Sequence, residues 1–449
     1  MKTGLLRENA AWIKWTVISF VFLCVFLVLN SKRSSILFVH QDEINFCQTG
    51  LYSYKTLVIE HDTTDPGWHD SFRSFGSPNP QIGKLLIGCS IWHHGFHDFS
   101  GVFNMWSHRI LVKNILADGR FPPGKLAAGR LPVVLLSALM AALLSWLAMI
   151  ATDGAGFSLP FQILSAITVV LLFLPNQTVH FGAFRAMLDA PAAAFSTTAI
   201  VLSIITLNRI HQNSLLSGFL FSIGSGIATG LAISTKMNAI LSWTSVLASI
   251  PAFAILLYMR GKLDRNRQRT LIGAWISQLL IPPIVFVGSN PYLYKNTWRG
   301  ICQMFAFGNQ IIQRKAHLPK YALYTLSDKI SSFFRSTTTP IASFRSPMIK
   351  GSLCFLMFAG ILTLLYLLWK NWRFRIVSDF CFTIPFLAWL CATVLGVIWW
   401  TPLSWNRYYL PAIPPLLILE SIGLTTLVWV AIHRKLPLKK TAENDHPAS

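Results

Sequence analysis

Two adjacent carboxylates, Asp42 and Glu43, follow the first apolar run of this 449-residue chain. A carboxylate near a low-dielectric surface tends to hold its proton more tightly, which suits the removal of a proton from an attacking hydroxyl. The pair could therefore act as a general base and its support. The alternative is an ordinary pair of solvated loop acids.

Cationic residues at the ends of apolar runs could hold a phosphate. They are Lys84, Arg185, Lys236 and Arg407. Lys84 lies in an apolar segment, 81–92, which is too short to span a membrane but suits its interface, where an ammonium can meet a lipid phosphate. Arg185 and Asp189 are one helical turn apart and could pair or contact a ligand. Headgroup binding and structural ion pairs are the alternatives.

A histidine cluster, His93, His94 and His97 followed by Asp98, has the residue types of a metal site. It lacks the His-Glu-x-x-His spacing that puts two ligands on one helix face. We therefore interpret it as an interfacial histidine cluster and expect no metal and no cofactor, with a divalent metal as the alternative.

The composition describes the elements that must position these residues. Of the chain, 53% is hydrophobic and only 12% charged, and the mean hydropathy is +0.51, which excludes a soluble enzyme. Apolar runs long enough to span a bilayer predict ten transmembrane helices. They are 12–30, 131–150, 157–175, 190–207, 215–235, 239–258, 271–289, 352–369, 380–400 and 409–431. The fold class is thus an all-α polytopic membrane protein.

Basic clusters set the expected orientation. The clusters within 260–269, 370–375 and 434–440 fall on one side of a ten-span chain, which should be cytoplasmic together with both termini. The net charge of +21 then reflects loops against anionic headgroups, and no nucleic-acid-binding motif is present. Two long outer loops, 31–130 and 290–351, should carry interfacial helices, one of them amphipathic over 322–334.

The whole chain, 1–449, is expected to be one membrane domain with a cytoplasmic tail at 432–449. No internal repeat supports a transporter built from two inverted halves. The seven cysteines are an odd number without a C-x-x-C motif. A Cys47–Cys89 disulfide stays open, since it depends on the compartment.

Several motifs together resemble the GT-C superfamily of polyprenyl-phosphate-sugar glycosyltransferases, above all protein O-mannosyltransferases and the aminoarabinose transferase family. The motifs are Asp42-Glu43, Pro80-Gln-Ile-Gly-Lys84, Arg130-Leu-Pro132, Phe184-Arg-Ala-Met-Leu-Asp-Ala-Pro191, Thr235-Lys236, Asn290-Pro-Tyr-Leu-Tyr294 and Arg407-Tyr-Tyr-Leu-Pro-Ala-Ile-Pro-Pro415. Asp42-Glu43 matches the acidic pair of the family. Lys84 matches the lysine that closes a His-Pro-Pro-Leu-x-Lys segment, but here this segment lacks the histidine and one proline.

The resemblance implies transfer of a glycosyl group, with inversion, from a polyprenyl-phosphate sugar to a protein, glycan or lipid hydroxyl outside the cytoplasm. Asp42 would be the base or acceptor-orienting residue and Glu43 its support. Lys84, Arg185, Lys236 and Arg407 would hold the donor phosphate, with Asp189, Tyr294 and Tyr408 as supporting candidates. A bacterial plasma membrane is the expected location. A transporter or flippase of the lipid-linked sugar, or a non-catalytic assembly partner, is the alternative.

Overall fold

A computed structural model describes residues 2–30, 39–64, 80–99, 115, 118, 121–316, 322–339, 347–374 and 376–435. These residues form helices, with one isolated β-bridge between Ala322 and Leu403. The predicted all-α membrane fold is confirmed. Eight of the described helices are long and apolar enough to span a membrane, and the other two predicted spans, 12–30 and 157–175, coincide with shorter apolar stretches at Ile13–Val28 and Leu159–Phe173.

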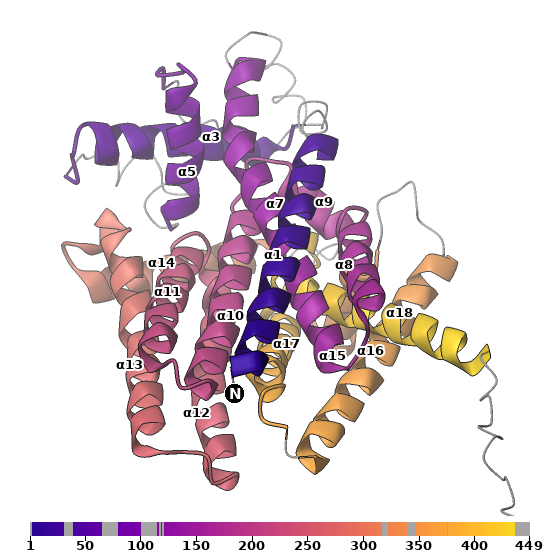
Figure 1. The fold of residues 1–449 in the computed structure, drawn as a ribbon. Helices are drawn as coiled ribbons and strands as arrows, with labels where there is room; N and C mark the ends of the chain where they lie inside the picture. Colours follow the sequence, from indigo (N-terminus) through magenta and orange to yellow (C-terminus); the bar gives the residue numbers. More distant parts are fainter. Residues whose placement is uncertain are drawn as a thin grey trace, which may run out of the picture.

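The bundle is built from long helices in chain order (Figure 1). They are α1 (Lys2–Asn30), α7 (Pro123–Gly154), α8 (Leu159–Phe173), α10 (Asp189–His211), α11 (Leu215–Ile233), α12 (Ile240–Met259), α13 (Arg265–Gly288), α16 (Pro347–Arg373), α17 (Phe380–Trp400) and α18 (Ile413–Lys435). A helix pairs its backbone N–H and C=O groups within itself, which is what a bilayer requires, and the side chains of these helices are mostly apolar.

Further helices occupy the connections. They are α3 (Gln41–Tyr54), which continues into a π-helical turn (Lys55–Ile59), α5 (Ile82–His93), α9 (Gln177–Ala183), α14 (Thr297–Ala316) and α15 (Leu326–Thr337), with 3-10 turns at Met237–Ala239, Pro291–Leu293 and Asn406–Ala412. Helices were predicted at 81–92 and 322–334, and α5 and α15 confirm them. Their place in a membrane interface stays a prediction.

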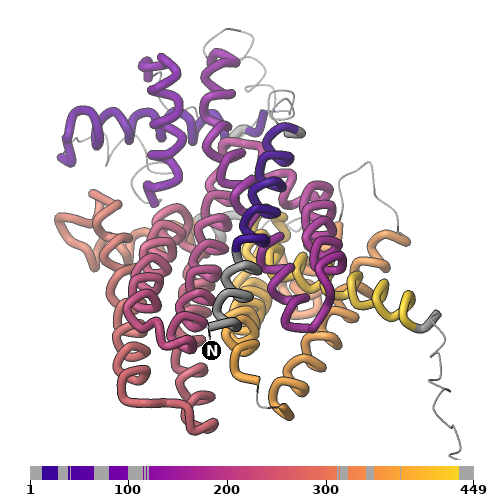
Figure 2. Tube along the Cα trace, viewed as in Figure 1, coloured from indigo at the N-terminus to yellow at the C-terminus, as the bar shows by residue number. Residues whose placement is uncertain are grey.

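The two ends of the bundle differ. Figure 1 shows α3 and α5 at one end, and the α12–α13 and α16–α17 connections, which carry two of the basic clusters, at the other. In Figure 2, α1 runs toward the end that holds α3 and α5. At the basic end Arg260 donates to the carbonyl of Trp372 over 2.9 Å and stacks on its ring, so the two clusters adjoin. The third cluster, 434–440, lies outside the residues whose side chains are described.

Helices α3 and α5 pack closely against each other, and α5 is attached to α7 of the bundle. Gly50 of α3 and Gly88 of α5 face each other so closely that a side chain at either would collide with the backbone of the other. Pro132, inside α7, has no N–H for the carbonyl of Ala128, and the Ser90 hydroxyl donates to that carbonyl over 2.6 Å instead. The proline of the Arg-Leu-Pro motif thus provides an attachment point for α5.

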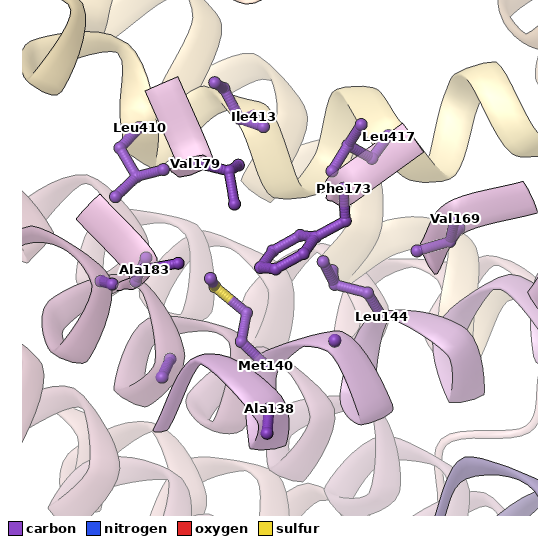
Figure 3. Close-up of a cluster of buried hydrophobic side chains, with 14 of the residues drawn as sticks. Ala138, Met140, Leu144, Val169, Phe173, Val179, Ala183, Leu410, Ile413 and Leu417 are labelled. Carbon is purple, nitrogen blue, oxygen red and sulfur yellow. The ribbon is translucent and has the colours of Figure 1, made fainter. Parts of the chain in front are cut away.

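A buried apolar core supports the end that carries α3 and α5. Figure 3 shows Phe173 of α8 directed between Met140 and Leu144 of α7, with Val179 of α9 and Ile413 of α18 nearby. The same core includes Ala183 and Leu410. Because these residues lie beside the segments that bear Arg185 and Arg407, packing fixes the backbone from which both cations project.

Candidate active site at one end of the bundle

Glu43 lies at the first turn of α3 and is fully buried. The Arg130 side chain of α7 donates to both of its carboxylate oxygens, at 2.8 Å and 2.9 Å. The backbone N–H groups of Ala186 and His40 donate to the same carboxylate at 2.9 Å and 2.8 Å. Four hydrogen bonds saturate the carboxylate, so Glu43 joins α3, α7 and the turn before α10, and it has no lone pair directed at a ligand.

Asp42 faces another way, although it is the next residue. Its carboxylate accepts a hydrogen bond of 2.8 Å from Arg407, which is 365 residues away in the sequence. The Asp42 side chain is 15% exposed and that of Arg407 is 25% exposed, so a solute can reach this pair while the Glu43 pair is closed to it. The structure therefore separates the acidic dipeptide into an accessible carboxylate and a structural one.

A second ion pair, with a buried carboxylate, adjoins the first. Lys236, at the start of the turn between α11 and α12, forms an ion pair with Asp189 at the first residue of α10. The Tyr408 ring lies beside both cations, with the Lys236 ammonium 5.6 Å and the Arg407 guanidinium 5.9 Å from its centroid. Burial lowers the pKa of Lys236, and Asp189 opposes that effect. We call Asp42, Arg407, Asp189, Lys236 and Tyr408 the mouth cluster.

The backbone that carries Arg407 is held by α15. The Tyr409 hydroxyl donates to the Ser332 hydroxyl at 2.7 Å, and Ser336 donates to the Asn406 side chain at 3.3 Å. A capping box at Thr325 and Asp328 begins α15, as its sequence requires. The hydroxyl-bearing face of α15 is thus buried against the 406–412 turn, while Leu326, Ile330 and Phe334 remain exposed.

Arg185 lies beside the Glu43 carboxylate. Its Nε is 4.0 Å from a Glu43 oxygen, its guanidinium stacks 4.7 Å from the centroid of Phe181, and it is 12% exposed. The predicted pairing of Arg185 with Asp189 is not what the structure shows, because Asp189 pairs with Lys236. The backbone bends between the two residues, since α10 begins only at Asp189.

Lys84 is fully buried in α5, and burial lowers its pKa well below the ordinary range of lysine. Helix α5 begins where the N–H of Ile82 donates to the carbonyl of Ser234, two residues before Lys236. The helix therefore adjoins the mouth cluster. Tyr294 is half-exposed, and its hydroxyl donates to the carbonyl of Gly288 at 2.6 Å rather than to a member of the mouth cluster. Asn290 of the same motif caps α5 by accepting from the Gln81 N–H at 3.0 Å.

A narrow crevice adjoins Asp189. It is lined mainly by small and apolar side chains from α10, α17 and the start of α18, and includes Ala193, Ser196, Trp389 and Pro411. The crevice thus combines a paired carboxylate with an otherwise largely apolar lining.

Arg130 is the functional residue to which the sequence reasoning gave no role, although it stands in the resemblance motif. A lone cation inside an apolar helix requires a partner, and this signal could have predicted its pairing. Of the histidine cluster, His93 lies 3.1 Å from the Tyr54 hydroxyl and His97 packs on Trp92. Within the described ranges no group of three or more His, Cys, Asp or Glu side chains could hold a metal. All seven cysteines, including Cys47 and Cys89, are free.

No protein-family model and no curated protein sequence matches the chain. Its fold is similar to that of the oligosaccharyltransferase of the archaeon Archaeoglobus fulgidus. The crystal structure of that protein with Zn and sulfate has a TM-score of 0.51 and 14% identity over 94% of this chain and 50% of its own. Its complex with an inhibitory peptide and a dolichol-phosphate has a TM-score of 0.51 and 13% identity over 98% of this chain and 53% of its own.

ArnT from Cupriavidus metallidurans is also similar, with a TM-score of 0.47 and 15% identity over 95% of this chain and 63% of its own. The chain spans about half the length of the oligosaccharyltransferase it matches. At these identities the likeness concerns the fold. The chain thus shares an all-α membrane fold with the archaeal oligosaccharyltransferase.

Proposed function

We propose that this protein transfers a glycosyl group from a polyprenyl-phosphate sugar to an acceptor hydroxyl on the extracytoplasmic face of a membrane. The observation that carries the proposal is the mouth cluster, in which the partly accessible Asp42, the buried Asp189 and two cations from distant segments meet at one end of a GT-C fold. The expected cytoplasmic place of the basic loops puts this cluster on the other side of the membrane.

The mouth cluster suits a phosphate leaving group. The donor phosphate would lie against Arg407 and Lys236, with Arg185 nearby, and the isoprenoid would extend into lipid. Asp42 would take the proton of the acceptor hydroxyl while the acceptor oxygen bonds to the anomeric carbon. The bond from that carbon to the phosphate oxygen would break, its electron pair would stay on the polyprenyl phosphate, and the anomeric centre would invert.

The Asp42–Arg407 ion pair implies an order of steps in this mechanism. Asp42 accepts a hydrogen bond of 2.8 Å from Arg407. A donor phosphate would compete for that guanidinium, and Asp42 would then be free to accept from the acceptor. Binding of the donor would thus precede activation of the acceptor.

Purified full-length protein, incubated with radiolabelled polyprenyl-phosphate sugars and membrane extract, tests the proposal. We expect label to move to an acceptor and bare polyprenyl phosphate to be released. Donor that crosses the bilayer of a proteoliposome without being consumed would instead indicate a flippase, and donor that is neither consumed nor moved would indicate an assembly partner.

The acceptor class and the location are part of the same proposal. The archaeal oligosaccharyltransferase has been solved tethered with an acceptor peptide that contains the NVT sequon, so peptides belong among the acceptors to be tried, with glycans and lipids. We propose a bacterial plasma membrane. A preference for an undecaprenyl carrier over a dolichyl carrier would support it, and the opposite preference would contradict it.

A further inference from the structure

His40 precedes the acidic dipeptide and caps α3. Its backbone is extended, its Nδ1 accepts a hydrogen bond of 3.2 Å from the N–H of Asp42, and its own N–H donates to Glu43. Serine, threonine, aspartate and asparagine are the usual residues at this position. A histidine caps the helix with one ring nitrogen and keeps a second polar atom beyond it.

This cap determines where the imidazole carries its proton. Because Nδ1 is the acceptor, the neutral ring has its hydrogen on Nε2. Asp42 Oδ2 is 3.8 Å from Nδ1, too far for a hydrogen bond. Burial is the largest influence on the pKa of His40 and lowers it; Asp42 and Glu43 act to raise it, and Arg407 and Arg185 act to lower it further. The neutral tautomer with an Nε2–H donor is the state that the surroundings favour.

The ring stands between two of the candidate phosphate-binding cations. It packs edge-on against Phe181 at 5.0 Å, and Arg185 stacks on the same phenyl ring at 4.7 Å. On its other side, Asp42 holds Arg407. The His40 side chain is 29% exposed, and within the described part of the chain no side chain or carbonyl accepts a hydrogen bond from Nε2.

We propose that His40 is a further donor-binding residue, whose Nε2–H donates a hydrogen bond to the phosphate of the lipid-linked donor between Arg185 and Arg407. The inference rests on the proposed function. A neutral donor adds direction to phosphate binding without adding a charge beside two guanidiniums. It also ties phosphate recognition to the cap that fixes Asp42.

The decisive variant is His40→Asn. The Asn side-chain oxygen can take over the cap, because asparagine is a preferred N-cap residue, but the shorter side chain cannot reach the phosphate with a donor. Binding of undecaprenyl phosphate to full-length protein in nanodiscs should weaken about tenfold or more, as expected when one hydrogen bond to a charged group is lost. The thermal midpoint should remain near that of wild type. His94→Asn, on the exposed end of α5, is the matched control and should bind normally.

Two outcomes would overturn the proposal. The first is unchanged undecaprenyl phosphate binding in a folded His40→Asn protein. The second is a ratio of the two dissociation constants, variant to wild type, that grows several-fold from about pH 8 to about pH 6, because that would show a cationic imidazolium rather than a neutral donor. Neither depends on transfer activity. If wild-type protein binds the lipid but never consumes a glycosylated donor, the proposed function fails while the phosphate-binding role of His40 stands.

Discussion

Asp42 and Glu43 are sequence neighbours that both hold a guanidinium, in opposite surroundings. Glu43 and Arg130 are 0% and 2% exposed at their side chains and are closed by two backbone N–H groups. Asp42 and Arg407 are 15% and 25% exposed and share one hydrogen bond. Consecutive residues of a helix point about 100° apart, so α3 directs one carboxylate into the bundle and the other to the mouth cluster.

The difference teaches that the same residue types serve two purposes. A saturated buried pair fixes the geometry and costs much if half of it is lost, because the remaining charge cannot be solvated. A half-open pair can exchange its partner for a ligand. We therefore expect substitutions at the closed pair to change stability first, and substitutions at the open pair to change chemistry or binding first.

Asp42→Asn should have the largest effect. Loss of a general base typically lowers the rate by about 10²–10⁴, while the amide keeps a hydrogen-bond partner for Arg407. Turnover of the glycosylated donor should fall by that factor with donor binding nearly unchanged, as measured by single-turnover kinetics. Glu60→Gln, the control, removes an exposed carboxylate outside the mouth cluster and should leave the rate unchanged. Wild-type turnover in folded Asp42→Asn protein would show that Asp42 is not the general base.

Arg130→Met should destabilise the protein by about 3–5 kcal/mol, since it leaves Glu43 as an unpaired buried charge. Denaturation in detergent measures it. Adding Glu43→Gln removes that charge and should restore part of the loss. Lys55→Met breaks the exposed Lys55–Glu60 pair and should cost no more than about 1 kcal/mol. Equal effects of the Lys55 and Arg130 substitutions would mean that burial does not distinguish the two kinds of pair.

Arg407→Ala should weaken donor binding by about 1.5–3 kcal/mol, the usual worth of a hydrogen bond to a charged group. The effect should appear in the donor KM before kcat, because the cation binds the phosphate while Asp42 remains. Arg299→Ala, an exposed arginine on α14, is the control. A fall in kcat with an unchanged KM would contradict the assignment of Arg407 to donor binding.

The pH dependence of stability should show the smallest effect. Burial lowers the pKa of His40 below its unfolded value of about 6.5, so the unfolded chain binds more protons between the two values. Stability contributed by neutral His40 is complete above about pH 6.5 and is lost as the pH falls toward the folded pKa. The thermal midpoints of wild type and His40→Asn should be measured at pH 7.5 and at about pH 5.5. The midpoint of wild type should fall more on acidification than that of the variant. Parallel curves would show that His40 is not buried as described.

The pattern of apolar residues along the chain was enough to predict the helices. Every predicted span coincides with a described helix, because an apolar run must satisfy its backbone internally wherever it lies in lipid. The candidate cations were also predictable, since charges are rare in this chain and stand at the ends of such runs. The α5 helix was predicted from its short apolar run and the α15 helix from its amphipathic periodicity.

Pairing could not be predicted in the same way. The sequence alone determined an all-α membrane protein, an acidic dipeptide beyond its first helix and a small set of cations that could meet a phosphate. Only the tertiary structure decided that Glu43 belongs to Arg130, that Asp189 belongs to Lys236 rather than to the nearby Arg185, and that Asp42 meets an arginine 365 residues away. The physical reason is that an ion pair depends on which helix ends pack together and which side chains that packing buries. Neither is encoded in the spacing of residues along one segment.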